Sequence, residues 1–123
     1  MINKKWTLLL LTIIYLILLT YVSLSPGERH EEISTLKENI DNFGHIPAYS
    51  ILTFLILKNL GSIIFRNQIF TFIIAVSYGI LMEYLQSFVP YRYTSWEDVL
   101  SDCLGIGLTL ILINKSSLKK TIQ

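Results

Sequence analysis

Apolar residues gather along the chain in four long runs that polar segments separate. The first run, 6–24, holds nineteen residues without a charged side chain, and the third, 67–91, is uncharged except at Glu83. A helix rises about 1.5 Å per residue, so roughly 20 apolar residues cross the ~30 Å core of a bilayer. We therefore predict an all-α, polytopic membrane protein with one domain over residues 1–123. The predicted transmembrane helices are four, at about 6–24, 45–65, 68–89 and 96–114.

The first run also has an interpretation as a cleaved signal peptide, because Lys4 and Lys5 precede it. The run is longer than a typical signal-peptide core, and no small-x-small cleavage site follows it. An anchored helix is therefore the preferred interpretation.

Basic residues are distributed unequally between the two sides that four spans define. Seven fall on the side of the termini and three on the other side. Lys and Arg are concentrated in the cytoplasmic loops of membrane proteins, so we predict that both termini are cytoplasmic. The side of the termini carries Lys4, Lys5, Lys58, Arg66, Lys115, Lys119 and Lys120, and the outer side carries Arg29, Lys37 and Arg92.

The segment between the first two spans predicts one further helix. We expect a short amphipathic helix that either lies on the outer membrane surface or packs against the spans. Gly44 is expected to end this helix, and Pro47 then falls in the first turn of the next one. The apolar residues of the segment are spaced three, four and three apart, as on one face of a helix, at Ile33, Leu36, Ile40 and Phe43.

The composition supports a membrane protein and excludes several functions. Hydrophobic residues make up 52% of the chain and charged residues 15%, which is far from the balance of soluble proteins. The net charge is +1, and no basic patch with interleaved aromatic residues suggests nucleic-acid binding. The one cysteine, Cys103, excludes a disulfide framework, and no GxSxG, HExxH or P-loop sequence is present. Gly105 and Gly107 favour close helix packing over ligand binding.

Polar side chains converge at the outer side of the predicted bundle. Glu83 lies only about 7 Å below the outer end of its span, and Asp98 and Asp102 are four residues apart on one helical face. A carboxylate within the membrane is tolerated when it faces the bundle interior. We therefore expect Glu83 to point inward, toward Arg92, His45 or a water-filled pocket. The predicted polar cluster consists of Glu83, Gln86, Arg92, Asp98, His45, Asp41, Asp102, Tyr49 and Ser95.

Several members of this cluster also have structural interpretations. Ser95, three residues before Asp98, is typical of a helix N-cap. Asp98 can form an ion pair with Arg92, and His45 can be an ordinary interfacial histidine. Glu83 has the weakest structural explanation, because a lone carboxylate inside a membrane is costly.

The charges of the cluster limit its chemistry. Its aspartate and glutamate side chains outnumber the one permanent cation, Arg92. This excess of acid indicates a protonated carboxyl group, a bound cation or metal, or an ammonium-bearing ligand. Arg92 with protonated His45 can instead bind a phosphate or carboxylate group. A single histidine among carboxylates is a weak metal signal, so we predict no metal and no cofactor.

Two stretches, DNFGHIPAYSIL at 41–52 and YGILMEYLQSFVPYRYTSWEDVLSDCLGIG at 78–107, resemble the VanZ-like family of small bacterial membrane proteins. Two positions depart from the family pattern: Asn42 replaces a frequent lysine, and Asp102 replaces a usual asparagine. Both shift the site toward negative charge and disfavour anion binding. The family residues fall on Asp41, His45, Tyr49, Tyr78, Gly79, Glu83, Gln86, Pro90, Arg92, Ser95, Asp98 and Gly105.

The resemblance implies a multi-pass protein of the bacterial cell membrane with a role in the cell envelope. The member that gives the family its name is associated with reduced susceptibility to teicoplanin. One hypothesis is an outer-leaflet pocket that binds a lipid headgroup, a lipid-linked cell-wall precursor or a lipoglycopeptide and lowers teicoplanin susceptibility. Another is a membrane-embedded enzyme with Glu83 or Asp98 as general base and His45 as acid–base partner. A third is a purely structural bundle. The expected partner is the lipid bilayer, and the sequence leaves the oligomeric state open.

Overall fold

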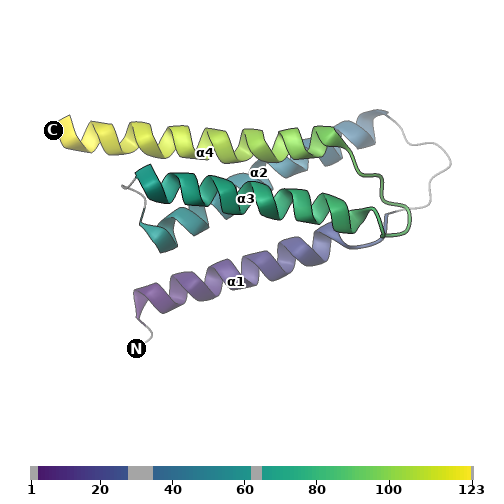
Figure 1. Cartoon of the computed structure of the whole chain (residues 1–123), viewed down its shortest axis with the longest axis horizontal. Coiled ribbons are helices and arrows are strands. Elements are labelled where there is room, and N and C mark those ends of the chain that lie inside the picture. The colour runs from purple at the N-terminus through teal and green to yellow at the C-terminus, as the bar shows by residue number, and fades with distance from the viewer. Residues whose placement is uncertain (1–2, 28–34, 62–64, 123) are drawn as a thin grey trace.

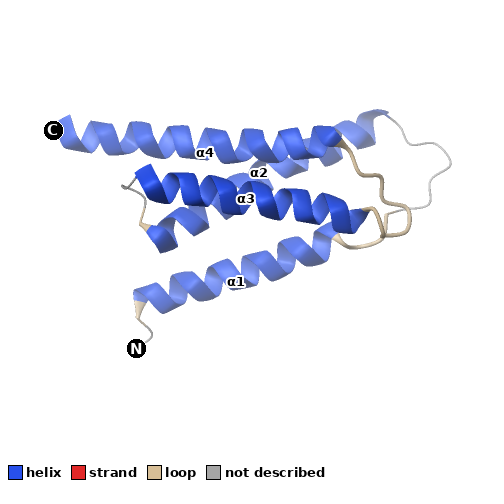
Figure 2. Ribbon diagram, in the orientation of Figure 1, coloured by secondary structure: helices blue, strands red, loops and turns tan. Residues whose placement is uncertain are grey.

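The chain is built from helices alone in the part that the structure describes. The computed structural model describes residues 3–27, 35–61 and 65–122, with the side chains of 35–42, 65–66 and 117–122 outside that description. No strand occurs in these ranges, which confirms the predicted all-α class (Figure 2). The helices are α1 (Lys4–Ser23), α2 (Thr35–Leu60), α3 (Phe65–Gln86) and α4 (Trp96–Ile122).

The helices form a bundle in which each one runs back along its predecessor (Figure 1). The start of α1 and the end of α4 lie at one end of this bundle, which we call the terminal end. At the other end α1 and α3 finish and α2 and α4 begin, and we call it the polar end. The most extensive helix contact joins α2 to α4, whereas α1 contacts α2 and, over fewer residues, α3. The parts of α2, α3 and α4 that carry the predicted site therefore meet toward the polar end.

The surface of the bundle is apolar, and many of its buried side chains are polar. Leucine, isoleucine and aromatic side chains are exposed along all four helices. Buried polar side chains include Thr53, Thr71, Gln86 and Asp102, and the buried apolar core is a small cluster around Leu52. Such an inverted distribution is expected when lipid surrounds the helices, because lipid tails do not drive apolar side chains inward.

Two helices are long and apolar enough to cross a membrane: Lys4–Ser23 and the Asn67–Gln86 part of α3. These match the first and third predicted spans. α4 is less apolar because acidic side chains lie in its first turn. α2 is less apolar because it contains Pro47 and Lys58. A membrane protein is thus supported, while crossing by α2 and α4 stays a prediction.

The predicted break at Gly44 is wrong, because α2 continues through both Gly44 and Pro47. The expected amphipathic segment is therefore the first part of the long α2 and not a separate surface helix. Its side chains before Phe43 lie outside the described residues. Glycine costs a helix only about 1 kcal/mol, and the packing of α2 along α4 offers continuous support for a single long helix.

A close approach of backbones holds α2 against α4 just below the polar end. A Cβ atom on Gly105 would collide with the backbone carbonyl of Ile46, so glycine is required there. Ser50 Oγ donates to the Gly105 carbonyl oxygen at 3.1 Å. The packing role predicted for Gly105 is confirmed. The same role predicted for Gly107 is wrong, since a Cβ there would meet nothing within 4 Å.

Hydrogen bonds on one side of α1 attach this helix to the rest of the bundle. Its side chains at 12, 15 and 20 and its carbonyl at 23 each have a partner on α2 or α3. The bonds are Asn59 Nδ2 to Thr12 Oγ1 (2.7 Å), Tyr15 Oη to the Ala48 carbonyl (2.7 Å), Thr20 Oγ1 with Tyr78 Oη (2.9 Å) and Gln86 Nε2 to the Ser23 carbonyl (3.1 Å).

Candidate functional site

Three helices bring one histidine and three carboxylates together at the polar end. α2 contributes His45, α3 contributes Glu83, and α4 contributes Asp98 and Asp102 one turn apart. The predicted common face of the two aspartates is confirmed, since both contact His45. All three carboxylate residues are buried, with exposed fractions of 8% or less. We call these four residues the His–carboxylate cluster.

His45 is held by Asp102 through its Nδ1 atom. The Nδ1 to Oδ1 distance is 2.8 Å, which is a strong hydrogen bond. An ionised carboxylate only accepts, so the bond places a ring proton on Nδ1, and in the neutral imidazole Nε2 is then an acceptor. Nε2 lies 3.9 Å from Asp98 Oδ1, and the ring stacks on that of Tyr49 with centroids 6.3 Å apart. Asp102 and Tyr49 thus fix the orientation of the imidazole.

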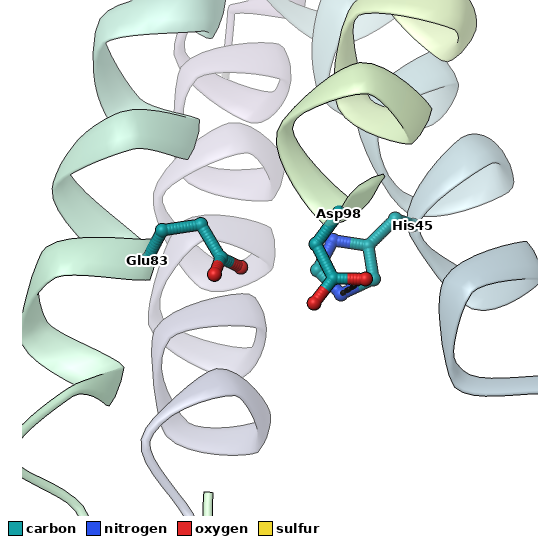
Figure 3. A group of neighbouring side chains, drawn as sticks. All are labelled: His45, Glu83 and Asp98. Carbon is teal, nitrogen blue, oxygen red and sulfur yellow. Dashed lines mark ion pairs between the residues drawn. The ribbon is translucent and has the colours of Figure 1, made fainter. Parts of the chain in front are cut away.

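Glu83 points across the bundle toward His45 and Asp98, as predicted (Figure 3). Its Oε2 atom accepts a hydrogen bond of 3.4 Å from the backbone N–H of Ser95. Its Oε1 atom has no hydrogen-bond partner among the described residues, although Glu83 is only 7% exposed. A buried polar atom without a partner is costly and calls for an explanation.

The structural interpretation of Ser95 is confirmed, because Ser95 caps α4. Its Oγ atom accepts from the backbone N–H of Glu97 at 3.0 Å, and its carbonyl accepts from the N–H of Asp98 at 3.2 Å. The cap also presents its own N–H to Glu83. Ser95 therefore starts the helix that carries both aspartates and steadies the glutamate of a neighbouring helix.

Arg92 was a predicted partner of Glu83 and Asp98, but its hydrogen bonds go to the end of α1. Its Nε atom donates to the Ser25 carbonyl at 3.1 Å, and an Nη atom donates to the Val22 carbonyl at 3.0 Å. Carbonyl groups at a helix C-terminus lack helical donors, and cations interact favourably with them. Arg92 thereby joins the turn between α3 and α4 to α1.

The turn that carries Arg92 is fixed by backbone contacts with the end of α1. Gly27 donates its N–H to the Pro90 carbonyl at 3.2 Å, and a Cβ on Gly27 would collide with the Tyr91 carbonyl. Tyr91 has a φ of 59°, which few non-glycine residues adopt. The strained turn between α3 and α4 therefore packs against the segment that follows α1, and this contact sets the position of Arg92.

Two pockets flank the His–carboxylate cluster. The end pocket, about 240 Å³, opens between α1, α2 and α3. The side pocket, about 350 Å³, lies between α3 and α4. The end pocket is lined by Leu19, Val22, Ser23, Gly44, His45, Ala48, Tyr49, Gln86 and Arg92. The side pocket is lined by Ile80, Glu83, Tyr84, Ser87, Thr94, Ser95, Trp96 and Val99.

The structure brings together most of the predicted cluster and adds residues that the sequence did not indicate. Asp41 is the exception, since its side chain lies outside the described residues. The added residues are apolar or act through their backbone: Leu19 and Ala48 line the end pocket, and Val22 and Ser25 bind Arg92. An apolar residue in an apolar helix gives no functional signal, and neither does a backbone carbonyl.

The cluster is able to hold a metal ion, although the sequence predicted none. One ligand atom each from His45, Glu83 and Asp98 lie within 4.8 Å of one another. The same groups can move a proton, because Asp102 orients the imidazole and leaves Nε2 facing a carboxylate. His45 is the member of the cluster that lines the end pocket together with Arg92.

Comparison with known proteins agrees with the resemblance seen in the sequence. The family model described as VanZ/LLP1 matches residues 6–118, nearly the whole chain. No curated protein and no solved structure matches the chain. The matched range includes all of α2 and α3 and all but the outermost residues of α1 and α4. The chain belongs to the VanZ/LLP1 family.

Proposed function

We propose that this protein crosses the bacterial cell membrane four times, with both termini in the cytoplasm, and binds a phosphorylated lipid headgroup in the end pocket. The observation that carries the proposal is the end pocket itself. It combines the guanidinium of Arg92 with the apolar side chains of Leu19, Val22 and Ala48. Such a pocket matches a ligand that has an anionic head and an apolar chain.

Arg92 supplies the anion-binding group. A guanidinium has five N–H donors, and the bonds to Ser25 and Val22 use two of them. The remaining donors can bind phosphate oxygens, for which a planar fork is well suited. Gln86, which is 3% exposed, lines the same pocket and helps to fix its shape through the Ser23 carbonyl.

The negative charge introduced by Asp102 does not oppose this proposal. Asp102 forms a hydrogen bond with His45 inside the cluster and does not line the end pocket. The carboxylate of Asp102 therefore interacts with the imidazole and not with a ligand in the end pocket. The departure from the family pattern at 102 leaves Arg92 as the charged side chain of the pocket wall.

In the proposed orientation the polar end lies at the outer leaflet, where lipid-linked cell-wall precursors are exposed to enzymes and to lipoglycopeptides. We therefore propose that the ligand is a lipid-linked cell-wall precursor or a related phospholipid. Binding there lowers the teicoplanin susceptibility of the cell.

The experiment is native mass spectrometry of the full chain with matched lipids. The lipids are a polyprenyl pyrophosphate and its polyprenol, and a phosphatidylglycerol and the diacylglycerol with the same chains. We expect the wild type to retain each phosphorylated lipid at least about tenfold better than its uncharged counterpart. Arg92→Gln should lose this preference, and Arg92→Lys should keep part of it because the charge remains.

Lys58→Gln is the matched control, because it removes one cation from an exposed position at the terminal end of α2. Unchanged retention by Lys58→Gln and loss by Arg92→Gln, with equal melting temperatures, support the pocket. Equal retention of the phosphorylated lipids by the two variants would refute it.

A second candidate function is catalysis on the same lipid, favoured by the pairing of His45 with Asp102. A carboxylate on Nδ1 and an accepting Nε2 are the arrangement of a general base. Turnover of the polyprenyl pyrophosphate by wild type, with retention but no turnover by His45→Gln, would show an enzyme. Retention without turnover by the wild type leaves binding as the function.

A further inference from the structure

Three side chains from three helices point at one small volume at the polar end. His45 on α2, Glu83 on α3 and Asp98 on α4 place ligand atoms within 4.8 Å of one another (Figure 3). These residues are far apart in the sequence and meet only in the fold. Two carboxylates and one imidazole form a donor set for a divalent cation, because their oxygen and nitrogen atoms are common metal ligands.

The glutamate of this set lacks a partner that a cation would supply. Glu83 is 7% exposed, and Oε1 has no hydrogen-bond partner among the described residues. Its other oxygen is fixed by the N–H of Ser95, so the carboxylate is already oriented. In its ionised form, a buried, oriented carboxylate oxygen directed at an imidazole and a second carboxylate is unfavourable unless a positive charge lies between them.

The histidine of this set is prepared as a ligand. Metal-binding histidines usually donate their second ring N–H to a carboxylate, which fixes the tautomer and the ring orientation. Asp102 accepts this bond from Nδ1 at 2.8 Å. Nε2 is then the accepting nitrogen, and it faces Asp98 at 3.9 Å. Asp102 thus acts as a positioning residue behind the histidine.

We propose that His45, Glu83 and Asp98 bind one first-row divalent cation, with Zn²⁺ as the best match. Two carboxylates neutralise the charge of the ion, which accounts for the excess of acid in the cluster. A nitrogen ligand favours Zn²⁺ over Mg²⁺ and Ca²⁺. Three protein ligands leave an open coordination position, as in catalytic zinc sites.

The proposed ligands lie between the two pockets. His45 lines the end pocket and Glu83 lines the side pocket. An exogenous oxygen ligand can therefore reach the ion from either side. The proposed metal site goes beyond the lipid-binding function and does not rest on it, because none of the three ligands is the guanidinium that binds the phosphate.

The test is a Zn²⁺ titration of the full chain in micelles, after dialysis against a chelator, in competition with a fluorescent zinc indicator. The affinity tag must contain no histidine. We expect one equivalent per chain. Glu83→Gln, Asp98→Asn and His45→Gln should each weaken binding by more than about 100-fold, because loss of an outer partner alone costs about 10–100-fold.

Glu97→Gln is the matched control, since it removes an exposed carboxylate beside Asp98 at the start of α4. It should bind Zn²⁺ like the wild type. Less than a fifth of an equivalent in the wild type would overturn the proposal. So would equal affinities of Glu83→Gln and Glu97→Gln. Isosteric changes keep the bundle intact, and a melting curve of each variant without metal verifies this.

The positioning role of Asp102 has its own readout. Asp102→Asn should weaken Zn²⁺ about 10–100-fold and change the visible absorption of bound Co²⁺, which reports coordination geometry. An unchanged Co²⁺ spectrum would overturn the role of Asp102. Arg92→Gln separates the two proposals, because it should bind Zn²⁺ normally and lose the phosphate preference. Loss of both properties in this variant would contradict two independent sites.

Discussion

The polar end and the terminal end of the bundle differ in the polar side chains that they hold and in how these side chains are paired. Near the terminal end, Gln68 and Asn114 exchange two hydrogen bonds of 2.7 and 3.0 Å between α3 and α4. Asn59 donates to Thr12 and to the carbonyl of Leu55. These groups are neutral and well matched. At the polar end the groups are charged, and Glu83 Oε1 has no hydrogen-bond partner within the described residues.

This difference indicates that the polar groups of the terminal end hold helices together, whereas those of the polar end form a binding site. Neutral amide pairs between membrane helices stabilise packing by up to about 1–2 kcal/mol each and need nothing further. Buried carboxylates stabilise little by themselves, and replacing a whole buried ion pair with well-packed apolar residues is often neutral or favourable. An arrangement that a protein could improve by removing charge indicates that the charge serves a ligand.

The largest expected effect on stability comes from disrupting the close approach of α2 and α4 at Gly105, because this contact supports the whole bundle. Gly105→Val should lower the free energy of unfolding by about 3 kcal/mol, because its side chain collides with the Ile46 backbone. Gly107→Val is the control and should stay within about 1 kcal/mol, since that position is open. Titration with SDS in mixed micelles measures both. Equal losses for the two variants would contradict the close approach of α2 and α4.

A smaller loss is expected when the terminal end loses one amide partner. Asn114→Ala leaves the Gln68 amide without its two bonds to this residue and should cost about 1 kcal/mol. Teicoplanin susceptibility at equal protein level should stay that of the wild type. A changed susceptibility would place function at the terminal end and break the contrast.

Glu83→Gln should have the opposite pattern. The free energy of unfolding should stay the same or rise by about 1 kcal/mol, because a buried charge is removed while the Ser95 contact can remain. Zn²⁺ binding should be lost. Immunoblots of membranes provide the control for protein level. If the variant vanishes from the membrane, the cluster is structural after all.

The two ends should also differ in their access to reagents, with no change in stability. In a Cys103→Ser background, His30→Cys should react with an impermeant thiol reagent in intact cells, and Lys119→Cys should react only after permeabilisation. This pattern follows from cytoplasmic termini. Labelling of position 119 and not of position 30 in intact cells would invert the proposed orientation.

The sequence predicted the helices and most of the cluster for physical reasons that can be named. Long apolar runs predicted α1 and α3. The spacing of four residues between Asp98 and Asp102 predicted that the two aspartates share one face of a helix. The depth of Glu83 placed it beside His45. Continuity of α2 through Gly44 could not be predicted, because contacts with α4 outweigh the local preference of one glycine. The partners of Arg92 are backbone carbonyls, which every residue has, so no pattern identifies them.

The attachment of α1 by polar bonds has a consequence for biogenesis. This helix is long and apolar enough to span alone, and only 6% of it is buried inside the bundle. It can therefore insert into the membrane as an independent helix and dock afterwards, since helix association in lipid follows insertion. Docking delivers Leu19 and Val22 to the wall of the end pocket and the α1 carbonyls to Arg92. The end pocket is complete only once α1 has docked.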